Sequence, residues 1–365
     1  MFGVAVHTPD VVGERMAGPG IRAWHLAGEL AKHFATTLVC KREGELPSAQ
    51  GFRVAARGGA EALVAMRSAD VLIGQPARGF RRQRRAAQRI VYDLFDPVLL
   101  ELREMYGRRP SIRQRIHFEA ERRRVRGALA EGDLLIVATA KQRELYQNAA
   151  GAIIEIPFGI EDVGVAVPGD RENIILWGGG MWEWLDPATA VEAVVAVNRR
   201  GLDCRLLFLG RSRPNRHSVD RRREDRLDAL IAGGKPFVEA NASWTPYRDR
   251  LAWLRRSKVA IMLHRPTAEA AYSIRTRLFD AIAAAVPVIT TEQGFAAELV
   301  SAEGLGVVVP PSDAAAVADG IARLIGDDGF YAACVSNLIR IQPRFAWDVV
   351  TRPLVEAVRQ WQRQR

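Results

Sequence analysis

The chain has 365 residues, of which 48% are hydrophobic, so it is long enough to bury more than one core. Its 52 lysines and arginines exceed its 42 acidic residues, giving a formal net charge of +10. The three cysteines are odd in number and widely spaced, which argues against a disulfide framework, and no apolar run reaches membrane-spanning length. The first residues are strand-like and carry no signal-peptide pattern, so we expect a cytoplasmic protein.

A glycine-rich turn follows the first predicted strand. Gly18 and Gly20 flank a proline in this turn, and glycines let the backbone approach a ligand closely. The helix predicted over 22–33 would present its N-terminus to the same space. Tight packing is the alternative reading of such glycines.

A central strand of the first half is predicted at 90–92, and Asp93 and Asp96 follow it directly. The next apolar segments end near a run at 157–171 that contains three glycines and two prolines, and we place the domain boundary there. Alternating strand and helix patterns on both sides predict two doubly wound α/β domains, at 1–165 and 166–342, with a terminal helix at 343–365.

The second half opens with a strand at 173–177 that runs into a triple-glycine turn, Gly178, Gly179 and Gly180. Asp186 and Pro187 are suited to starting the helix predicted over 188–197. A turn between a strand and a helix is where a doubly wound domain receives a nucleotide phosphate or sugar. His264 follows a later strand at 259–263, where it would serve either the fold or a ligand.

An anion site is predicted at 272–294. Ser273 is a suitable N-cap for a helix that starts near Ile274, with Thr276 at the N3 position. Arg275 and Arg277 add two charges to the positive end of this helix, a combination that suits phosphate.

Asp280 shares a helix face with Arg277 and is placed to accept hydrogen bonds from ribose hydroxyls. The alternative is an ordinary amphipathic helix with solvated arginines. The strand predicted at 287–291 ends in a polar loop that contains Glu292. A final helical pattern covers 345–364.

In this order, the motifs resemble those of retaining GT-B glycosyltransferases of family 4, especially a bacterial branch. The matching segments span most of the chain: Gly-Pro-Gly-Ile-Arg at 18–22, Asp-Leu-Phe-Asp-Pro at 93–97, Gly-Gly-Gly-Met-Trp-Glu-Trp-Leu-Asp-Pro at 178–187, and Ile-Arg-Thr-Arg-Leu-Phe-Asp at 274–280. The resemblance implies two Rossmann-like domains facing across a cleft that holds the active site, with the terminal helix crossing back to the first domain.

The resemblance also implies roles for individual residues. The helix that carries Arg275 and Arg277 would contact the donor diphosphate, and Asp280 would bind the ribose. Asp93 and Asp96 would face the cleft as catalytic candidates. His264 would touch the donor sugar or pyrophosphate, and backbone amides of the loop at Glu292 and Gly294 would meet the sugar or phosphate.

Two departures from the family pattern affect the site. Many relatives hold the donor with two glutamates, and here Tyr272 stands at the first position; Glu269 either substitutes for it or is a plain surface acid. The segment 178–184 also lacks the arginine and lysine that clasp the diphosphate in many relatives, so Arg275 and Arg277 would carry that load, or Arg211 and Arg213 would reach in.

The excess of positive charge is concentrated in the first half. One run holds Arg78, Arg81, Arg82, Arg84, Arg85 and Arg89, and the segment 108–126 holds eight arginines against two glutamates. Contact with an anionic membrane or a lipid-linked acceptor is one interpretation, and a solvated basic surface is the other. Nucleic acid is disfavoured as a partner because the runs lack interleaved aromatic residues.

These observations predict a metal-independent glycosyltransferase that uses a nucleoside diphosphate sugar as co-substrate and no other cofactor. The acceptor would be a hydroxyl of a saccharide, a lipid-linked sugar or a small molecule, in polysaccharide or glycoconjugate synthesis. The sequence has no Asp-x-Asp pair of the kind that binds a metal ion, and arginines with helix dipoles can stabilise the leaving diphosphate instead. Two alternatives stay open: a nucleotide-sugar epimerase, and a non-catalytic subunit that binds sugar nucleotides.

Overall fold

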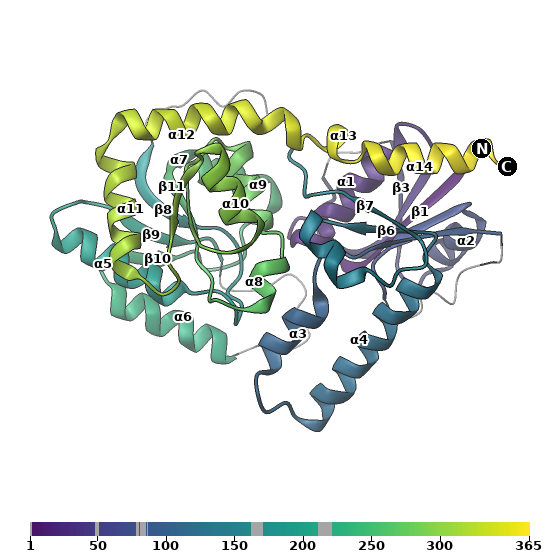
Figure 1. Ribbon diagram of the computed structural model, residues 1–365, viewed down its shortest axis with the longest axis horizontal. Helices are drawn as coiled ribbons and strands as arrows, with labels where there is room; N and C mark the ends of the chain where they lie inside the picture. The colour runs from purple at the N-terminus through teal and green to yellow at the C-terminus, as the bar shows by residue number, and fades with distance from the viewer. Residues whose placement is uncertain are drawn as a thin grey trace. The chain divides into compact units, whose positions relative to one another are not determined.

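The computed structural model describes residues 2–47, 51–77, 80, 85, 87–161, 171–210 and 221–365. It divides into two compact units (Figure 1). Unit 1 comprises Met1–Gly159, Tyr272–Ile274 and Phe345–Arg365, and unit 2 comprises Ile160–Ala271 and Arg275–Arg344. The boundary predicted between 165 and 166 lies outside the described residues.

Unit 1 is built on a parallel sheet. Its described part has seven strands in the order β3-β2-β1-β4-β5-β6-β7. The strands are β1 Gly3–Gly13, β2 Ala35–Glu43, β3 Arg53–Ala56, β4 Val71–Gly74, β5 Arg89–Asp93, β6 Leu134–Val137 and β7 Ala152–Glu155. The central residues of β1, β2, β4, β5 and β6 are almost completely buried, as apolar strands covered by helices on both faces must be, and the edge strands β3 and β7 are more exposed.

The helices of unit 1 are α1 Gly18–Ala31, α2 Ala60–Ser68, α3 Val98–Tyr106, α4 Ile112–Glu131, α13 Trp347–Val350 and α14 Arg352–Arg363, with a 3₁₀ helix η2 at Ala140–Tyr146. The helix predicted over 22–33 begins earlier than predicted, because Pro19 in the first turn is compatible with a helix start. Figure 1 shows α3 and α4 as a helical pair whose connecting turn lies away from the strands of unit 1.

The single terminal helix predicted over 345–364 is wrong. The chain instead forms the 3₁₀ helix η4 Gln342–Phe345 and the short helices α13 and α14. Pro353 occupies the first turn of α14, where its missing N–H is tolerated, but inside a continuous helix it would remove a hydrogen bond. The hydroxyl of Thr351 donates to the carbonyl of Trp347 at 2.6 Å and closes α13.

Unit 2 is built on a second parallel sheet, which has six strands in its described part, in the order β10-β9-β8-β11-β12-β13. The strands are β8 Glu172–Trp177, β9 Arg205–Phe208, β10 Val238–Ala240, β11 Ser257–Met262, β12 Val288–Thr291 and β13 Gly306–Val309. The helices are α5 Pro187–Arg199, α6 Arg221–Gly234, α7 Arg250–Arg256, α8 Ala268–Tyr272, α9 Thr276–Ala283, α10 Gly294–Glu303, α11 Ala314–Gly326 and α12 Asp328–Ile341, with the 3₁₀ helix η3 at Tyr247–Asp249. The prediction of two doubly wound α/β domains is confirmed.

Both sheets reverse their strand order beside the first strand of the unit. In unit 1 the reversal falls between β1 and β4, and in unit 2 it falls between β8 and β11. The loops after two such strands diverge to opposite faces of the sheet and leave a crevice at the carboxyl edge, where α/β proteins bind ligands. Each unit therefore has one edge position at which a site is expected. Among the described residues, no helix is both long and apolar enough to cross a lipid bilayer.

The terminal segment is attached to unit 1 through Trp347. Its indole stacks on the ring of His25 at 4.8 Å and meets the ring of Phe158 edge-on at 5.2 Å. A Cβ on Gly159 would lie 2.3 Å from the indole, so the backbone there is pressed against the ring.

Replacing Trp347 with alanine should therefore lower the free energy of unfolding by about 3–5 kcal/mol, the usual cost of emptying a buried aromatic position. Chemical denaturation measures this loss. The matched control is Trp361→Ala in α14, because that indole is only half-buried and should cost less. Equal losses in the two variants would contradict the anchoring role.

Candidate functional site

The triple-glycine turn and His264 lie side by side in unit 2 because β8 and β11 are neighbours at the strand-order reversal. Two backbone hydrogen bonds, which together form one antiparallel bridge, join the two loops. The amide of Asp186 donates to the carbonyl of Leu263 at 3.0 Å, and that of Arg265 donates to Trp184 at 2.8 Å. Leu185 and His264 are the residues paired in this bridge. The residues at the end of β8 therefore have a fixed position relative to those after β11.

The helix that carries the arginines begins later than predicted. Ser273 is not its N-cap: α8 ends at Tyr272, a short extended link follows, and α9 starts at Thr276. Arg275 occupies the N-cap position without a side-chain cap, so Thr276 is the first helical residue instead of N3. The amides of the first turn are therefore left without a capping side chain, and Arg275 and Arg277 flank them.

Glu269 and Arg275 form a buried ion pair. The two guanidinium nitrogens donate to the two carboxylate oxygens at 2.7 and 2.8 Å, and the Glu269 side chain is only 1% exposed. The interpretation of Glu269 as a plain surface acid is therefore wrong. Both of its oxygens hold Arg275, so its direct contribution is to fix the direction of that guanidinium.

Arg277 lies across the glycine turn. Its Nη2 donates to the carbonyl of Gly180 at 2.5 Å, and the guanidinium lies 5.5 Å from the ring centre of Trp177. Gly179 has φ +94°, and a Cβ there would lie 3.2 Å from Arg277 Nε, so a side chain would be both strained and crowded. Burial, together with the charge of Arg275, lowers the pKa of Arg277 to about 9.

Three buried nitrogen atoms in this region make no hydrogen bond within the described structure. Arg277 Nη1 and Arg275 Nε are buried and make no hydrogen bond, and His264 Nε2 is in the same condition. Unsatisfied donors next to two guanidinium charges are costly unless an anion completes them. The arrangement is chemically suited to phosphate oxygens.

His264 is buried and neutral over the physiological range. Burial and the charge of Arg275 lower the pKa of His264 to about 4. Its Nδ1 lies 3.3 Å from the carbonyl of Arg265, and a carbonyl can only accept, so Nδ1 carries the proton. The unpartnered Nε2 is therefore an acceptor, which suits a sugar hydroxyl better than a phosphate.

Asp280 is paired with an arginine that was not predicted. Arg250 Nε donates to Asp280 Oδ1 at 2.9 Å, and the guanidinium stacks 3.8 Å from the ring centre of Tyr247. The Tyr247 hydroxyl in turn donates to Glu161 Oε1 at 2.6 Å. Asp280 Oδ2 makes no hydrogen bond to any described residue, so one carboxylate oxygen is left for a ligand.

The loop after β12 contributes less than predicted. The amide of Glu292 donates to the carbonyl of Val309 at 2.8 Å and is used within the sheet, while the side chain is exposed. Gly294 has φ +82°, and a Cβ there would lie 2.2 Å from the carbonyl of Ala270. This glycine allows the loop to pack against α8, the helix that carries Glu269.

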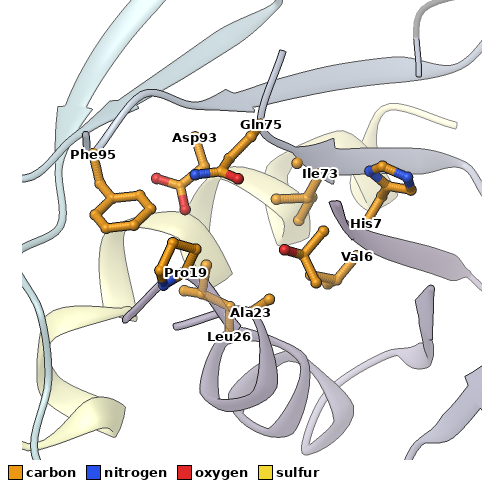
Figure 2. A pocket seen from close by; sticks show the side chains of 11 residues that line it. Val6, His7, Pro19, Ala23, Leu26, Ile73, Gln75, Asp93 and Phe95 are labelled. Atoms are coloured by element: carbon orange, nitrogen blue, oxygen red, sulfur yellow. The ribbon is translucent and has the colours of Figure 1, made fainter. Parts of the chain in front are cut away.

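Unit 1 has a small pocket at its own strand-order reversal (Figure 2). It lies between the ends of β1, β4 and β5 and the start of α1, and its lining residues are Val6, His7, Thr8, Pro19, Ala23, Leu26, Ile73, Gly74, Gln75, Asp93 and Phe95. Gly18 begins α1 beside this pocket. Gly20 does not face a ligand, because a Cβ on it would lie 2.2 Å from the carbonyl of Val11; it is required for packing.

Asp93 is held by Arg22 rather than free for chemistry. Arg22 Nε and Nη2 donate to its two oxygens at 2.7 and 3.1 Å, and the Arg22 side chain is 1% exposed. The same guanidinium donates to the carbonyls of Ile156 and Pro157 at 3.1 and 3.0 Å. Asp93 is thus the counter-ion of a buried arginine that ties α1 to the end of the sheet.

Asp96 has a carboxyl group whose pKa is strongly shifted. Burial, then the negative charges of Glu101, Asp10 and Asp93, raise the pKa of Asp96 well above its ordinary value. A raised pKa is compatible with an acid or base role, and the role of Asp96 in catalysis stays a prediction.

Some predicted residues lie outside the described part of the chain: Arg78, Arg81, Arg82, Arg84, Arg211 and Arg213. Within the described ranges, no group of three or more His, Cys, Asp or Glu side chains could hold a metal ion. The sequence did not indicate that Arg22, although part of the Gly-Pro-Gly-Ile-Arg motif, is a buried counter-ion of Asp93, or that Arg250 pairs with Asp280. A buried arginine needs a carboxylate, but the sequence does not say which of its many arginines is buried.

Part of the second half of the chain is similar to a known protein family. Residues 172–327 match the family model described as glycosyl transferases group 1. None of the curated proteins matches the chain.

Solved structures match almost all of both chains at low identity. Sucrose-phosphate synthase from Thermosynechococcus elongatus has 18% identity, covers 100% of each chain and gives a TM-score of 0.72. The Anabaena protein HepE in complex with UDP-glucose has 13% identity, covers 99% of this chain and 100% of its own, and gives 0.72. WaaG, a glycosyltransferase involved in lipopolysaccharide biosynthesis, has 15% identity, covers 97% and 99%, and gives 0.70. The predicted GT-B fold with two Rossmann-like domains is confirmed.

Replacing Asp93 with alanine should lower the free energy of unfolding by about 3–5 kcal/mol, because Arg22 is then buried without a counter-ion. Urea denaturation monitored by tryptophan fluorescence measures the loss. Asp96→Asn is the matched control and should cost far less, since the amide resembles a protonated carboxyl. A stable but inactive Asp93→Ala protein would instead restore Asp93 as a catalytic residue.

The buried histidine should make the protein sensitive to acid. Because the pKa of His264 falls from 6.5 to about 4 on folding, the unfolded chain binds a proton in this window that the folded chain does not. Stability is therefore full above pH 6.5 and falls by about 1.4 kcal/mol per pH unit toward pH 4.

His264→Gln should remove that part of the slope. Denaturation midpoints measured between pH 4 and pH 6.5 test this. A loss of packing that is the same at every pH lowers the stability but does not change its slope against pH. His7→Gln should act in the same way, since burial, with the charge of Arg57, lowers the pKa of His7 to about 4 as well. An unchanged slope in His264→Gln would show that His264 titrates normally.

Proposed function

We propose that this chain, whose residues 172–327 form a group 1 glycosyl transferase domain, transfers a sugar from a nucleoside diphosphate sugar to a hydroxyl acceptor. Transfer proceeds with retention at the anomeric carbon and without a metal ion. The single observation that carries this proposal is the pair of buried arginines at the start of α9, Arg277 on the glycine turn and Arg275 on Glu269, each with one guanidinium nitrogen left unpaired. HepE, a structural neighbour, binds UDP-glucose, which supports a donor of the same class.

The diphosphate lies at the start of α9. Arg277 Nη1, Arg275 Nε and the uncapped amides of the first turn supply hydrogen bonds, and the helix dipole adds to the two charges. Gly178 leaves the backbone open at the end of β8, where no other atom lies within 4 Å of the Cβ position, and the Arg277 guanidinium lies against Gly179. These groups neutralise the charge that develops on the leaving diphosphate.

The reaction needs no strong side-chain base in unit 2. The bond between the anomeric carbon and the diphosphate oxygen breaks while the acceptor hydroxyl attacks from the same face. Its proton passes to the departing phosphate oxygen, so atoms and charge balance. Attack on the same face retains the configuration of the sugar.

The remaining polar groups select the donor. Asp280 Oδ2 accepts a hydrogen bond from a ribose hydroxyl, and Arg250 donates to Asp280 Oδ1 and so fixes the carboxylate. His264 Nε2 accepts a hydroxyl of the transferred sugar, and its low pKa keeps it in the neutral form that can do so. Glu269 acts through Arg275, whose direction it fixes.

The acceptor is a hydroxyl of a saccharide, a lipid-linked sugar or a small molecule in polysaccharide or glycoconjugate synthesis. The involvement of WaaG in lipopolysaccharide biosynthesis supports this class of pathway. We place the protein in the cytoplasm, with peripheral contact to an anionic membrane.

Two experiments with the purified chain test the donor site. Calorimetry with UDP, GDP and ADP identifies the nucleotide, and inorganic pyrophosphate separates the phosphate contacts from the ribose contacts. Arg277→Gln should weaken both the nucleotide and pyrophosphate by about 10- to 100-fold, since it removes charge-assisted hydrogen bonds. Asp280→Asn should weaken only the nucleotide.

Arg248→Gln is the matched control for loss of charge, because this arginine lies in the same unit and is exposed. It should leave both affinities unchanged. Addition of EDTA should also leave them unchanged. If Arg277→Gln bound pyrophosphate as well as the unaltered protein does, the donor site would be elsewhere.

Turnover distinguishes the transferase from its alternatives. Release of nucleoside diphosphate that depends on an added hydroxyl acceptor identifies a transferase. Conversion of the donor sugar without any acceptor identifies an epimerase. Tight donor binding with neither reaction, over a broad range of acceptors, identifies a non-catalytic binding subunit.

A further inference from the structure

The turn between α3 and α4 in unit 1 exposes both arginines and large apolar side chains. We call residues 107–116 the α3–α4 tip. It contains Arg108, Arg109, Arg113 and Arg115, and no acidic residue occurs between Glu104 and Glu119. Two large apolar side chains project from the same ten residues: Ile112 is 77% exposed and Ile116 is 64% exposed.

The geometry of α4 brings these features onto one face. Side chains four residues apart share a helix face, so Ile112 and Ile116 lie together. Arg113 and Arg115 fall on the two sides of this pair. Ser111 and Gln114 form a capping box at the start of the helix, which fixes where the isoleucines begin and leaves the positive end of the helix dipole at the tip.

Three arginines in the middle of α4 are paired with acidic residues, and, among the described residues, those of the tip are not. Further along the helix, Arg122 donates to Glu119 at 2.7 Å, Arg123 pairs with the same carboxylate, and Arg124 pairs with Glu121. By contrast, no described acidic side chain pairs with Arg108, Arg109 or Arg113. A hydrogen bond between Tyr106 at the end of α3 and His117 in α4 joins the two helices next to the tip. This bond restricts the conformation of the tip.

We propose that the α3–α4 tip docks on an anionic lipid bilayer, with Ile112 and Ile116 inserted at the level of the headgroups and the arginines on the lipid phosphates. Exposed isoleucines gain nothing from a nucleic acid, whose binding to a basic helix is carried by charge and by aromatic stacking. An interfacial helix needs both features together, an apolar strip and flanking cations. This inference identifies the surface for the membrane contact proposed above, and its argument does not depend on the transfer reaction.

Co-sedimentation of the full chain with vesicles tests the proposal. Vesicles of phosphatidylcholine with phosphatidylglycerol should bind the protein, and vesicles of phosphatidylcholine alone should not. Replacing Arg108, Arg109 and Arg113 with glutamine should weaken binding by about fivefold per arginine. The matched control replaces Arg122, Arg123 and Arg124, which are paired with Glu119 and Glu121, with glutamine and should weaken it far less.

The apolar contribution is tested with the charge kept. Ile112→Ser with Ile116→Ser should weaken vesicle binding about tenfold or more. Leu63→Ser with Val64→Ser on α2, which removes the other exposed large apolar side chains, should have no effect. Equal binding of the two double variants to anionic vesicles would overturn the proposal.

Insertion can be observed with a fluorophore attached to a single introduced cysteine. The native cysteines, Cys40, Cys204 and Cys334, are buried and should not react with the label. An environment-sensitive fluorophore on the thiol of an Ile112→Cys variant should brighten with anionic vesicles, while the same probe on a Val64→Cys variant should not. Two results would overturn the proposal: binding of a single-stranded RNA oligonucleotide as tightly as the vesicles, or self-association through the tip that Ile112→Ser with Ile116→Ser abolishes. Donor binding is measured in a separate experiment with pyrophosphate. A failure of the membrane proposal would therefore not contradict the proposed transferase function.

Discussion

The position of the candidate site follows from one constraint, the reversal of strand order between β8 and β11. Parallel strands joined by helices on opposite faces leave the carboxyl edge open at that point alone. The glycine turn, His264 and the start of α9 all reach this edge, although they are far apart in the sequence. What the side chains then add is charge: two guanidinium groups, one of them held by the buried carboxylate of Glu269.

Buried arginines organise both units in the same manner. In unit 1, Arg22 is satisfied by Asp93 and by two backbone carbonyls, so its charge is fully used within the fold. In unit 2, the carboxylate of Glu269 satisfies Arg275 in part, and Arg277 has only a carbonyl. The difference separates a structural cation from one that is available to a ligand.

The sequence predicted the fold well because its signals are local and repeated. Apolar strands ending in glycine, as at Gly178–Gly180, and helix starts such as Asp186 are recognisable without tertiary information. The start of α9 was predicted wrongly, since Ser273 satisfies the local rule for an N-cap but the chain is extended there. The ion pairs were inaccessible for a different reason. Whether Glu269 is a surface acid or a buried counter-ion depends on α8 packing beneath the loop at Gly294, which no local pattern encodes.

The pair of arginines at the start of α9 also makes the stability of the folded protein depend on the anions around it. Arg277 is deprotonated more easily than a free arginine because burial and Arg275 oppose its charge, so the unliganded site is electrostatically strained. Any multivalent anion that enters relieves this strain and favours the folded state by mass action. Phosphate or sulfate in a buffer would thus act as a weak ligand, raising the melting temperature and reducing the apparent affinity for nucleotides. In a cell, the lifetime of the protein would rise with the supply of its own sugar donor.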